Sequence, residues 1–106
     1  MTKLNYEGIT SINLDNIIPT EVAPGVSQYI LWENENNKIS AVYKFEKNSK
    51  FPIDFHEIYD EHIYVLSGTF NDGKTDYKKG SYIVNPKGTV HHPQSKEGCT
   101  VLVVYP

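Results

Sequence analysis

Hydrophobic and polar residues alternate over short stretches of the chain, and this pattern predicts β-strands almost throughout. Successive side chains of a strand point to opposite faces, so tyrosine, isoleucine and valine at every second position indicate one buried face. The predicted strands span 26–32, 39–45, 54–56, 62–66, 69–71, 81–84 and 100–105. No window of a dozen residues has a helical period, so we expect at most a brief helical turn over 15–18, ended by Pro19.

Turn-forming residues separate the predicted strands. The run from Asn71 to Lys74 combines asparagine, aspartate and glycine, which predicts a tight hairpin. Gly68 stands just before the strand 69–71 and indicates a bend inside the first arm of that hairpin. Many short strands within 106 residues are typical of an all-β sandwich or barrel, and a jelly roll is one natural way to close it.

Strand alternation also places charged side chains on the same face as the core. Asp54 and His56 share one face of their predicted strand, and Glu61 shares a face with Ile63 and Val65. If the two aliphatic residues line the interior, the Glu61 carboxylate enters it near the mouth. A lone carboxylate there is costly unless it is paired or bound to a cation.

The alternation of side chains along a strand also predicts which way the remaining histidines point. Only one of the neighbours His91 and His92 can face inward on an extended strand, and we expect it to be His91. We expect His62 and His92 on the outer face, although a register shift of one residue would exchange His62 with Glu61.

Composition narrows the class of protein. A chain of 106 residues is expected to form one domain, 1–106, with a single core. Its net charge is −3 and its ten basic residues are all lysines, scattered along the chain, so we expect no nucleic-acid partner. The pattern contains no membrane span or leader, which predicts a cytoplasmic protein. The lone Cys99 excludes a disulfide within the chain and is expected to be a small buried side chain.

Two spaced motifs are similar to those of the cupin superfamily. The first reads Asp54-x-His56-x4-Glu61-x6-Gly68, with Asp54 where the family has a histidine. Asn48 lies in the region where the family usually turns with glycine. The motif covers about 54–68.

The second motif covers about 80–95 and fits more closely. It reads Gly80-x5-Pro86-x-Gly88-x2-His91, with Ser95 where the family has an asparagine. The stretches 65–70, 80–86 and 97–102 resemble the cupin domain of ChrR-type anti-sigma factors. The resemblance covers roughly residues 20–105 and implies a cupin jelly-roll β-barrel, also called a double-stranded β-helix.

The resemblance implies one divalent metal ion, Fe, Mn, Zn or Ni, between the two motifs. By position its ligands would be His56, Glu61 and His91, with Asp54 matching by position alone. Three roles are open for Asp54: a fourth ligand, a partner that holds a metal-bound water, or the mark of a site that no longer binds metal. We favour the second, because aspartate is shorter than histidine. The alternative without a metal is that His56 and His91 are hydrogen-bonded groups at the barrel mouth.

Three functions remain open. We expect a cupin with a single metal site, and the first open function is a metal-dependent enzyme of dioxygenase or isomerase type acting on a small organic molecule, with Asp54 as a candidate base. It is otherwise a ChrR-like sensing module that binds a ligand without catalysis, or a metal-free scaffold. The resemblance also implies a homodimer, formed through an outer sheet face or an N-terminal strand.

Overall fold

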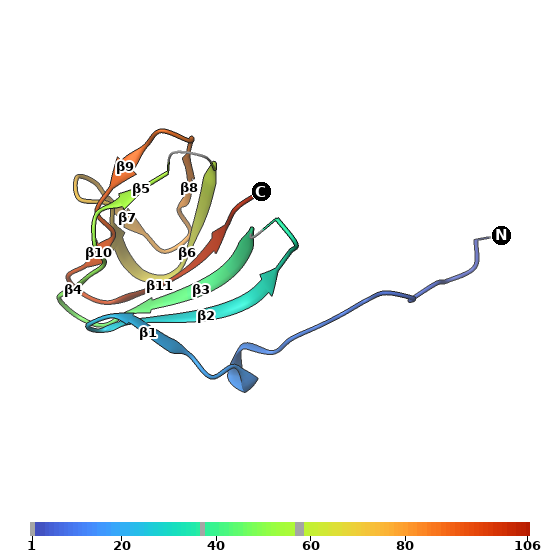
Figure 1. The fold of residues 1–106 in the computed structure, drawn as a ribbon. Helices are drawn as coiled ribbons and strands as arrows, with labels where there is room; N and C mark the ends of the chain where they lie inside the picture. Colours follow the sequence, from blue (N-terminus) through green and yellow to red (C-terminus); the bar gives the residue numbers. More distant parts are fainter. Residues whose placement is uncertain (1, 37, 57–58) are drawn as a thin grey trace.

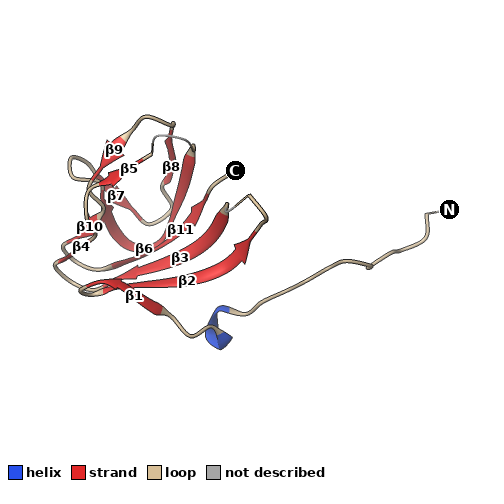
Figure 2. Cartoon of the chain, viewed as in Figure 1, coloured by secondary structure: helices blue, strands red, loops and turns tan. Residues whose placement is uncertain are grey.

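The chain winds into an open barrel of antiparallel strands, preceded by a long extended arm (Figures 1 and 2). The structure, a computed structural model, describes residues 2–36, 38–56 and 59–106. Within these ranges the one helical element is the 3-10 turn η1, Leu14–Asn16. The strands are β1 Thr20–Ala23, β2 Val26–Glu33, β3 Ile39–Phe45, β4 Ser49–Lys50, β5 Asp54–Phe55, β6 Glu61–Asn71, β7 Asp76–Lys78, β8 Tyr82–Asn85, β9 Val90–His91, β10 Gln94–Ser95 and β11 Cys99–Val104.

Two layers share the strand β6. The first half of β6 pairs with β11 and with β8. This half belongs to a curved layer with the strand order β1-β2-β3-β11-β6, and β8 joins the layer at β6. The second half of β6 pairs with β7 and β10, and β10 pairs in turn with β4. The separate pair β5-β9 lies at one end of the barrel (Figure 1). The all-β barrel predicted from the sequence is therefore confirmed.

Gly68 is the point at which β6 passes from one layer to the other. Its φ of 71° lies in the left-handed region, and a β-bulge interrupts the pairing with β11 just before it. The sequence pattern predicts the bend correctly but divides the strand into 62–66 and 69–71, which is wrong. The glycine bends the backbone without ending its ladder of hydrogen bonds.

The core follows the predicted alternation. Along β6 the side chains of Ile63 and Val65 are buried, whereas Tyr64 and Leu66 on the other face are 40% and 38% exposed. The interior is filled by aromatic and aliphatic side chains contributed by β2, β3, β6, β8 and β11. Its buried hydrophobic members are Val26, Phe45, Ile63, Val65, Phe70, Ile83, Cys99, Val101 and Val103.

Turns agree with the local chemistry of the sequence. The Asp72 carboxylate accepts hydrogen bonds from the backbone of Lys74 and Thr75, which closes the predicted hairpin between β6 and β7. Asn48 has a φ of 59°, the left-handed conformation that asparagine tolerates in place of glycine. The pattern does not predict β1, β4, β7, β9 and β10, because strands of two to four residues are too short to show alternation.

The N-terminal arm, residues 2–13, projects away from the barrel (Figure 1). Its residues are all exposed, and the Asn13 side chain caps η1 by accepting a hydrogen bond from the backbone N–H of Asp15. No helix among the described residues is long and apolar enough to cross a membrane.

Candidate metal centre

Four side chains named by the sequence motifs meet at the barrel end. Asp54, His56, Glu61 and His91 each contribute one potential ligand atom, and these atoms lie within 4.8 Å of one another. His56, Glu61 and His91 are 6%, 3% and 9% exposed, so the expectation that all three face inward is confirmed. Asp54 is only partly covered.

Strand pairing at the β5-β9 ladder produces this convergence. Asp54 lies opposite His91 in the register, which joins the first motif to the second although 37 positions of sequence separate them. The backbone N–H of His56 donates to the carbonyl of Thr89 over 3.0 Å, and the backbone N–H of Gly88 donates to the carbonyl of His56. These bonds hold His56 beside β9, with its side chain on the same side as that of Asp54.

The two imidazoles face each other across the site. Their Nε2 atoms are 2.7 Å apart, and the rings are stacked with 17° between their planes. Glu61 Oε1 lies 3.1 Å from each of the two nitrogens. Asp54 Oδ2 lies 3.2 Å from His56 Nε2. Two nitrogens and two oxygens therefore point at one common position.

The charges of the cluster are coupled. Burial by itself would raise the pKa of Glu61, but the hydrogen bond with His91 and the nearby imidazoles lower it below its ordinary value. Burial would lower the pKa of His91, and the contacts with Glu61 raise it. Each group therefore favours the charged form of the other, and the carboxylate is kept ionised.

The donor set fits a divalent cation. Imidazole nitrogens together with carboxylate oxygens are the ligands that Fe(II), Mn(II), Zn(II) and Ni(II) accept in proteins. A carboxylate and two imidazoles buried this close to one another are costly unless a proton or a cation lies between them. His91 Nδ1, the nitrogen that faces away from the cluster, is the one buried side-chain polar atom of the described residues without a hydrogen-bond partner.

Two residues that the motifs do not contain hold Glu61 in place. Asn85 Nδ2 donates to Glu61 Oε1 over 3.2 Å, and the Tyr105 hydroxyl donates to Glu61 Oε2 over 3.3 Å. Burial and the nearby Glu61 raise the pKa of Tyr105, so its hydroxyl keeps the proton that it donates. The register of β6 and β8 places Asn85 opposite Glu61. Neither residue was predicted from the sequence, because neither belongs to a motif. Asn85 is placed beside Glu61 by this strand register, which the sequence does not reveal.

A cavity of about 150 Å³ extends from the cluster into the barrel. Its polar end is formed by Asp54, Glu61 and His91. The remaining wall is formed by aromatic and apolar side chains: Tyr43, Phe45, Phe51, Ile63, Phe70, Pro93, Val101, Val103 and Tyr105.

The two histidines that were expected on the outer face, His62 and His92, do not belong to the cluster. His62 Nδ1 is 2.5 Å from the Tyr82 hydroxyl on the outer face of the sheet. His92 is half-buried and its backbone N–H donates to the carbonyl of Asp72, away from the cluster. Cys99 is buried, and burial raises the pKa of its thiol to about 11, which agrees with its expected role as a small apolar side chain.

Comparison with known proteins extends this picture. Residues 10–105 match the family model described as the ChrR cupin-like domain. A search of curated proteins finds no match.

Solved structures share the fold. A chain in the crystal structure of Rhodobacter sphaeroides SigE in complex with the anti-sigma ChrR superposes with a TM-score of 0.73 and 20% identity, over 89% of this chain and 52% of that chain. Acetylacetone dioxygenase from Acinetobacter johnsonii gives a TM-score of 0.78 and 15% identity, over 99% of this chain and 77% of that one. KdgF from Halomonas sp. gives a TM-score of 0.76 and 24% identity, over 91% of this chain and 93% of that one. The chain thus spans about half the length of its match in the SigE–ChrR complex.

Proposed function

The chain belongs to the ChrR cupin-like domain family, and from this premise we propose that it binds one divalent metal ion together with a small organic molecule. The metal is held by Asp54, His56, Glu61 and His91, and the organic molecule occupies the adjoining cavity. One observation carries the proposal: the four side chains that can bind a metal converge at the polar end of an otherwise apolar cavity.

Asp54 is assigned here as a ligand rather than as a partner of a water molecule. Its Oδ2 lies 3.2 Å from His56 Nε2, almost the same as the 3.1 Å between that nitrogen and Glu61 Oε1. This distance supports a direct ligand role for the short aspartate side chain, whose backbone lies in the β5-β9 ladder. Two carboxylates make the site anionic and oxygen-rich, which favours Fe(II) or Mn(II) over softer ions.

Size and polarity define the class of organic ligand. A cavity of about 150 Å³ is comparable to an engineered apolar cavity that accommodates benzene. The ligand is therefore a compact molecule with an apolar body inside the barrel and oxygen atoms toward the metal end. A bound cation would supply Lewis acidity that polarises those oxygens.

The chain's own residues orient the metal ligands and shield the site from water. Asn85 and Tyr105 donate to the two oxygens of Glu61 and fix its direction. Phe45, Phe70 and Val101 are buried, line the cavity and keep its wall apolar. A reaction of dioxygenase or isomerase type on a small oxygenated molecule is the activity that this arrangement supports best.

A sensing module that binds its ligand without turnover is the second candidate. It is favoured by the family match and by the likeness to a chain of the SigE–ChrR complex. Oxygen consumption separates the two candidates: protein loaded with Fe(II) and supplied with small diketones consumes oxygen if it is a dioxygenase. Saturable ligand binding without oxygen uptake, and without conversion of the ligand, supports the sensing module.

Metal analysis tests the proposal directly. Protein purified without chelators should contain about one equivalent of a transition metal by mass spectrometry of the elements. The variants His56→Ala and His91→Ala should lose it, because each removes a nitrogen ligand. His62→Ala is the matched control, since this histidine lies on the outer face and should leave the metal content unchanged. Metal retained at full stoichiometry in His56→Ala and His91→Ala would refute the site.

A further inference from the structure

The cavity wall contains a polar group that the metal cluster does not use, the hydroxyl of Tyr43. Of the described residues that line the cavity, Tyr43 is the one polar side chain that neither belongs to the cluster nor bonds to it. Strand alternation on β3 turns it inward together with the buried Ala41 and Phe45. A polar group in an otherwise apolar wall is costly unless it has a hydrogen-bond partner.

Gln28 supplies a partner for only one side of this hydroxyl. The pairing of β2 with β3 places Gln28 opposite Tyr43, and Gln28 Nε2 donates to the Tyr43 hydroxyl oxygen over 2.7 Å. This is the one hydrogen bond that the described residues make with the hydroxyl, and in it Tyr43 is the acceptor. A phenolic hydroxyl can both accept and donate, so its proton is available to an acceptor in the cavity.

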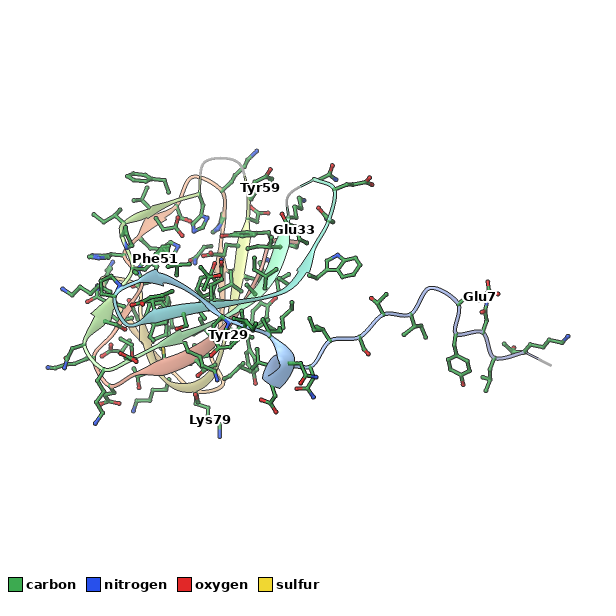
Figure 3. The ribbon with its side chains drawn as sticks, turned by 60° about the horizontal axis from the view of Figure 1, so that its bottom comes forward. Glu7, Tyr29, Glu33, Phe51, Tyr59 and Lys79 are labelled. Carbon is green, nitrogen blue, oxygen red and sulfur yellow. The ribbon has the colours of Figure 1, made fainter. Side chains whose placement is uncertain are left out.

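The Tyr43 ring is held in place and its hydroxyl keeps its proton. Phe51, labelled in Figure 3, comes from the segment between β4 and β5. It meets the Tyr43 ring edge to face, with 6.4 Å between the ring centroids and 65° between the planes. Burial raises the pKa of Tyr43, against the opposing effect of the Gln28 hydrogen bond. The hydroxyl is therefore a fixed hydrogen-bond donor at neutral pH.

Charge is the second property of the cavity that selects a ligand. The two carboxylates of Asp54 and Glu61 balance the charge of a divalent cation bound with neutral imidazoles. None of the described lining residues is a lysine, and the chain has no arginine. Lys38 lies over the Tyr59 ring outside this lining, and its ammonium group donates to the backbone carbonyl of Pro106. An anionic ligand would therefore bring an uncompensated negative charge into an apolar cavity, which is costly.

We propose that the organic ligand is uncharged and has two oxygen functions, one directed to the metal and one that accepts a hydrogen bond from Tyr43. The assignment rests on the metal site proposed above and makes Tyr43 a specificity-determining residue. A neutral molecule with two carbonyl, hydroxyl or ether oxygens satisfies both ends of the cavity. A ligand with a single oxygen leaves the Tyr43 proton buried without a partner, and a site of this kind rejects such analogues.

Calorimetric titration of the metal-loaded full chain with small cyclic probes tests the proposal. The probes are cyclohexanone, cyclohexane-1,2-dione, cyclohexane-1,4-dione and cyclohexanecarboxylate, which share one ring and differ in the number of oxygen functions or in charge. The diones place the second oxygen beside the first or opposite to it. We expect one of them to bind about 10-fold more tightly than cyclohexanone, because only the dione accepts from Tyr43. Cyclohexanecarboxylate should bind more weakly than that dione.

Variants of the hydrogen-bonded pair locate the source of this preference. Tyr43→Phe removes the donor and should abolish the preference for the dione without changing the affinity for cyclohexanone, whereas a loosened barrel would weaken both ligands. Gln28→Glu keeps the hydroxyl but supplies a carboxylate that accepts its proton, so it should abolish the preference as well. Tyr77→Phe is the matched control, since Tyr77 donates to Asp72 and does not line the cavity. Circular dichroism shows whether each variant is folded.

Metal content, measured on the same samples, separates failure of this assignment from failure of the metal site. Wild-type protein without metal would overturn both. With the metal bound, the assignment alone is overturned if no probe binds at millimolar concentration, or if neither dione is preferred over cyclohexanone. It is also overturned if cyclohexanecarboxylate binds as tightly as the diones, or if folded Tyr43→Phe or Gln28→Glu retains the preference.

Discussion

Replacement of Gly68 by alanine should destabilise the barrel far more than the same replacement at Gly80. Both glycines have a positive φ, 71° and 92°, so alanine at either position incurs the left-handed penalty of about 1–2 kcal/mol. At Gly68 the new Cβ would also overlap the carbonyl oxygen of Gly98 and lie 2.8 Å from the Cα of Cys99. At Gly80 no atom lies within 4 Å of that position.

Relief of the clash requires β6 and β11 to separate, because the obstacle is backbone rather than a mobile side chain. Overpacking of this kind costs about 1–3 kcal/mol, which brings the total for Gly68→Ala to about 2–5 kcal/mol. Urea unfolding followed by tryptophan fluorescence measures both variants. With a slope of about 1.5 kcal/mol per molar urea, Gly68→Ala should lower the midpoint by about 1–3 M, and Gly80→Ala by about 1 M. Midpoints that agree within about 0.3 M would refute the argument that close backbone approach requires this glycine.

Three further predictions concern single groups. Burial raises the pKa of Cys99 from 9.0 to about 11, so its contribution to stability is complete below pH 9 and falls by about 3 kcal/mol as the pH rises through 11. Cys99→Ala should reduce the alkaline loss of stability in urea titrations by about this amount, the rest being due to Tyr43 and Tyr105, whose pKa values are also raised; an unchanged loss contradicts the assignment. In metal-free protein, the lowered pKa of Glu61 stabilises the fold above about pH 4.5 and the raised pKa of His91 stabilises it below about pH 6.5. The melting temperature should therefore be greatest between about pH 4.5 and about pH 6.5, and it should vary less with pH in Glu61→Gln. An identical pH profile for the variant would show that Glu61 and His91 do not cause this pH dependence. Tyr105→Phe removes the hydroxyl that donates to Glu61 and should weaken metal binding about 10-fold in a competition titration with a chelating dye, whereas unaltered affinity would exclude this role.

Alternation was sufficient to predict which way the side chains of the longer strands point. The inward faces of Glu61, Ile63 and Val65 follow from a period of two, which depends on backbone geometry and on no distant contact. The order and spacing of the motifs predicted correctly that Asp54, His56, Glu61 and His91 come together. Their role as metal ligands stays a prediction.

Residues that contact the site but lie outside the two motifs could not be predicted from strand alternation or motif spacing. Asn85 and Tyr105 contact Glu61 because of the register of β6 with β8 and the position of the chain after β11, and neither position has a spacing signature. The distance of Asp54 from the other site residues could not be judged from the sequence for a similar reason, since the ladder with β9 sets the position of its backbone.

Local chemistry thus accounts for the strands, the turns and the inward direction of three site residues, because these depend on neighbours a few positions apart. Pairing between distant strands sets the distances within the metal centre and aligns a row of apolar residues on the outer face of the sheet: Tyr29, Val42, Leu102, Tyr64 and Tyr82. This row takes one residue from each of the strands β2, β3, β11, β6 and β8, so no single strand reveals it. Side chains that are unremarkable along the chain become one continuous surface only when the register aligns them.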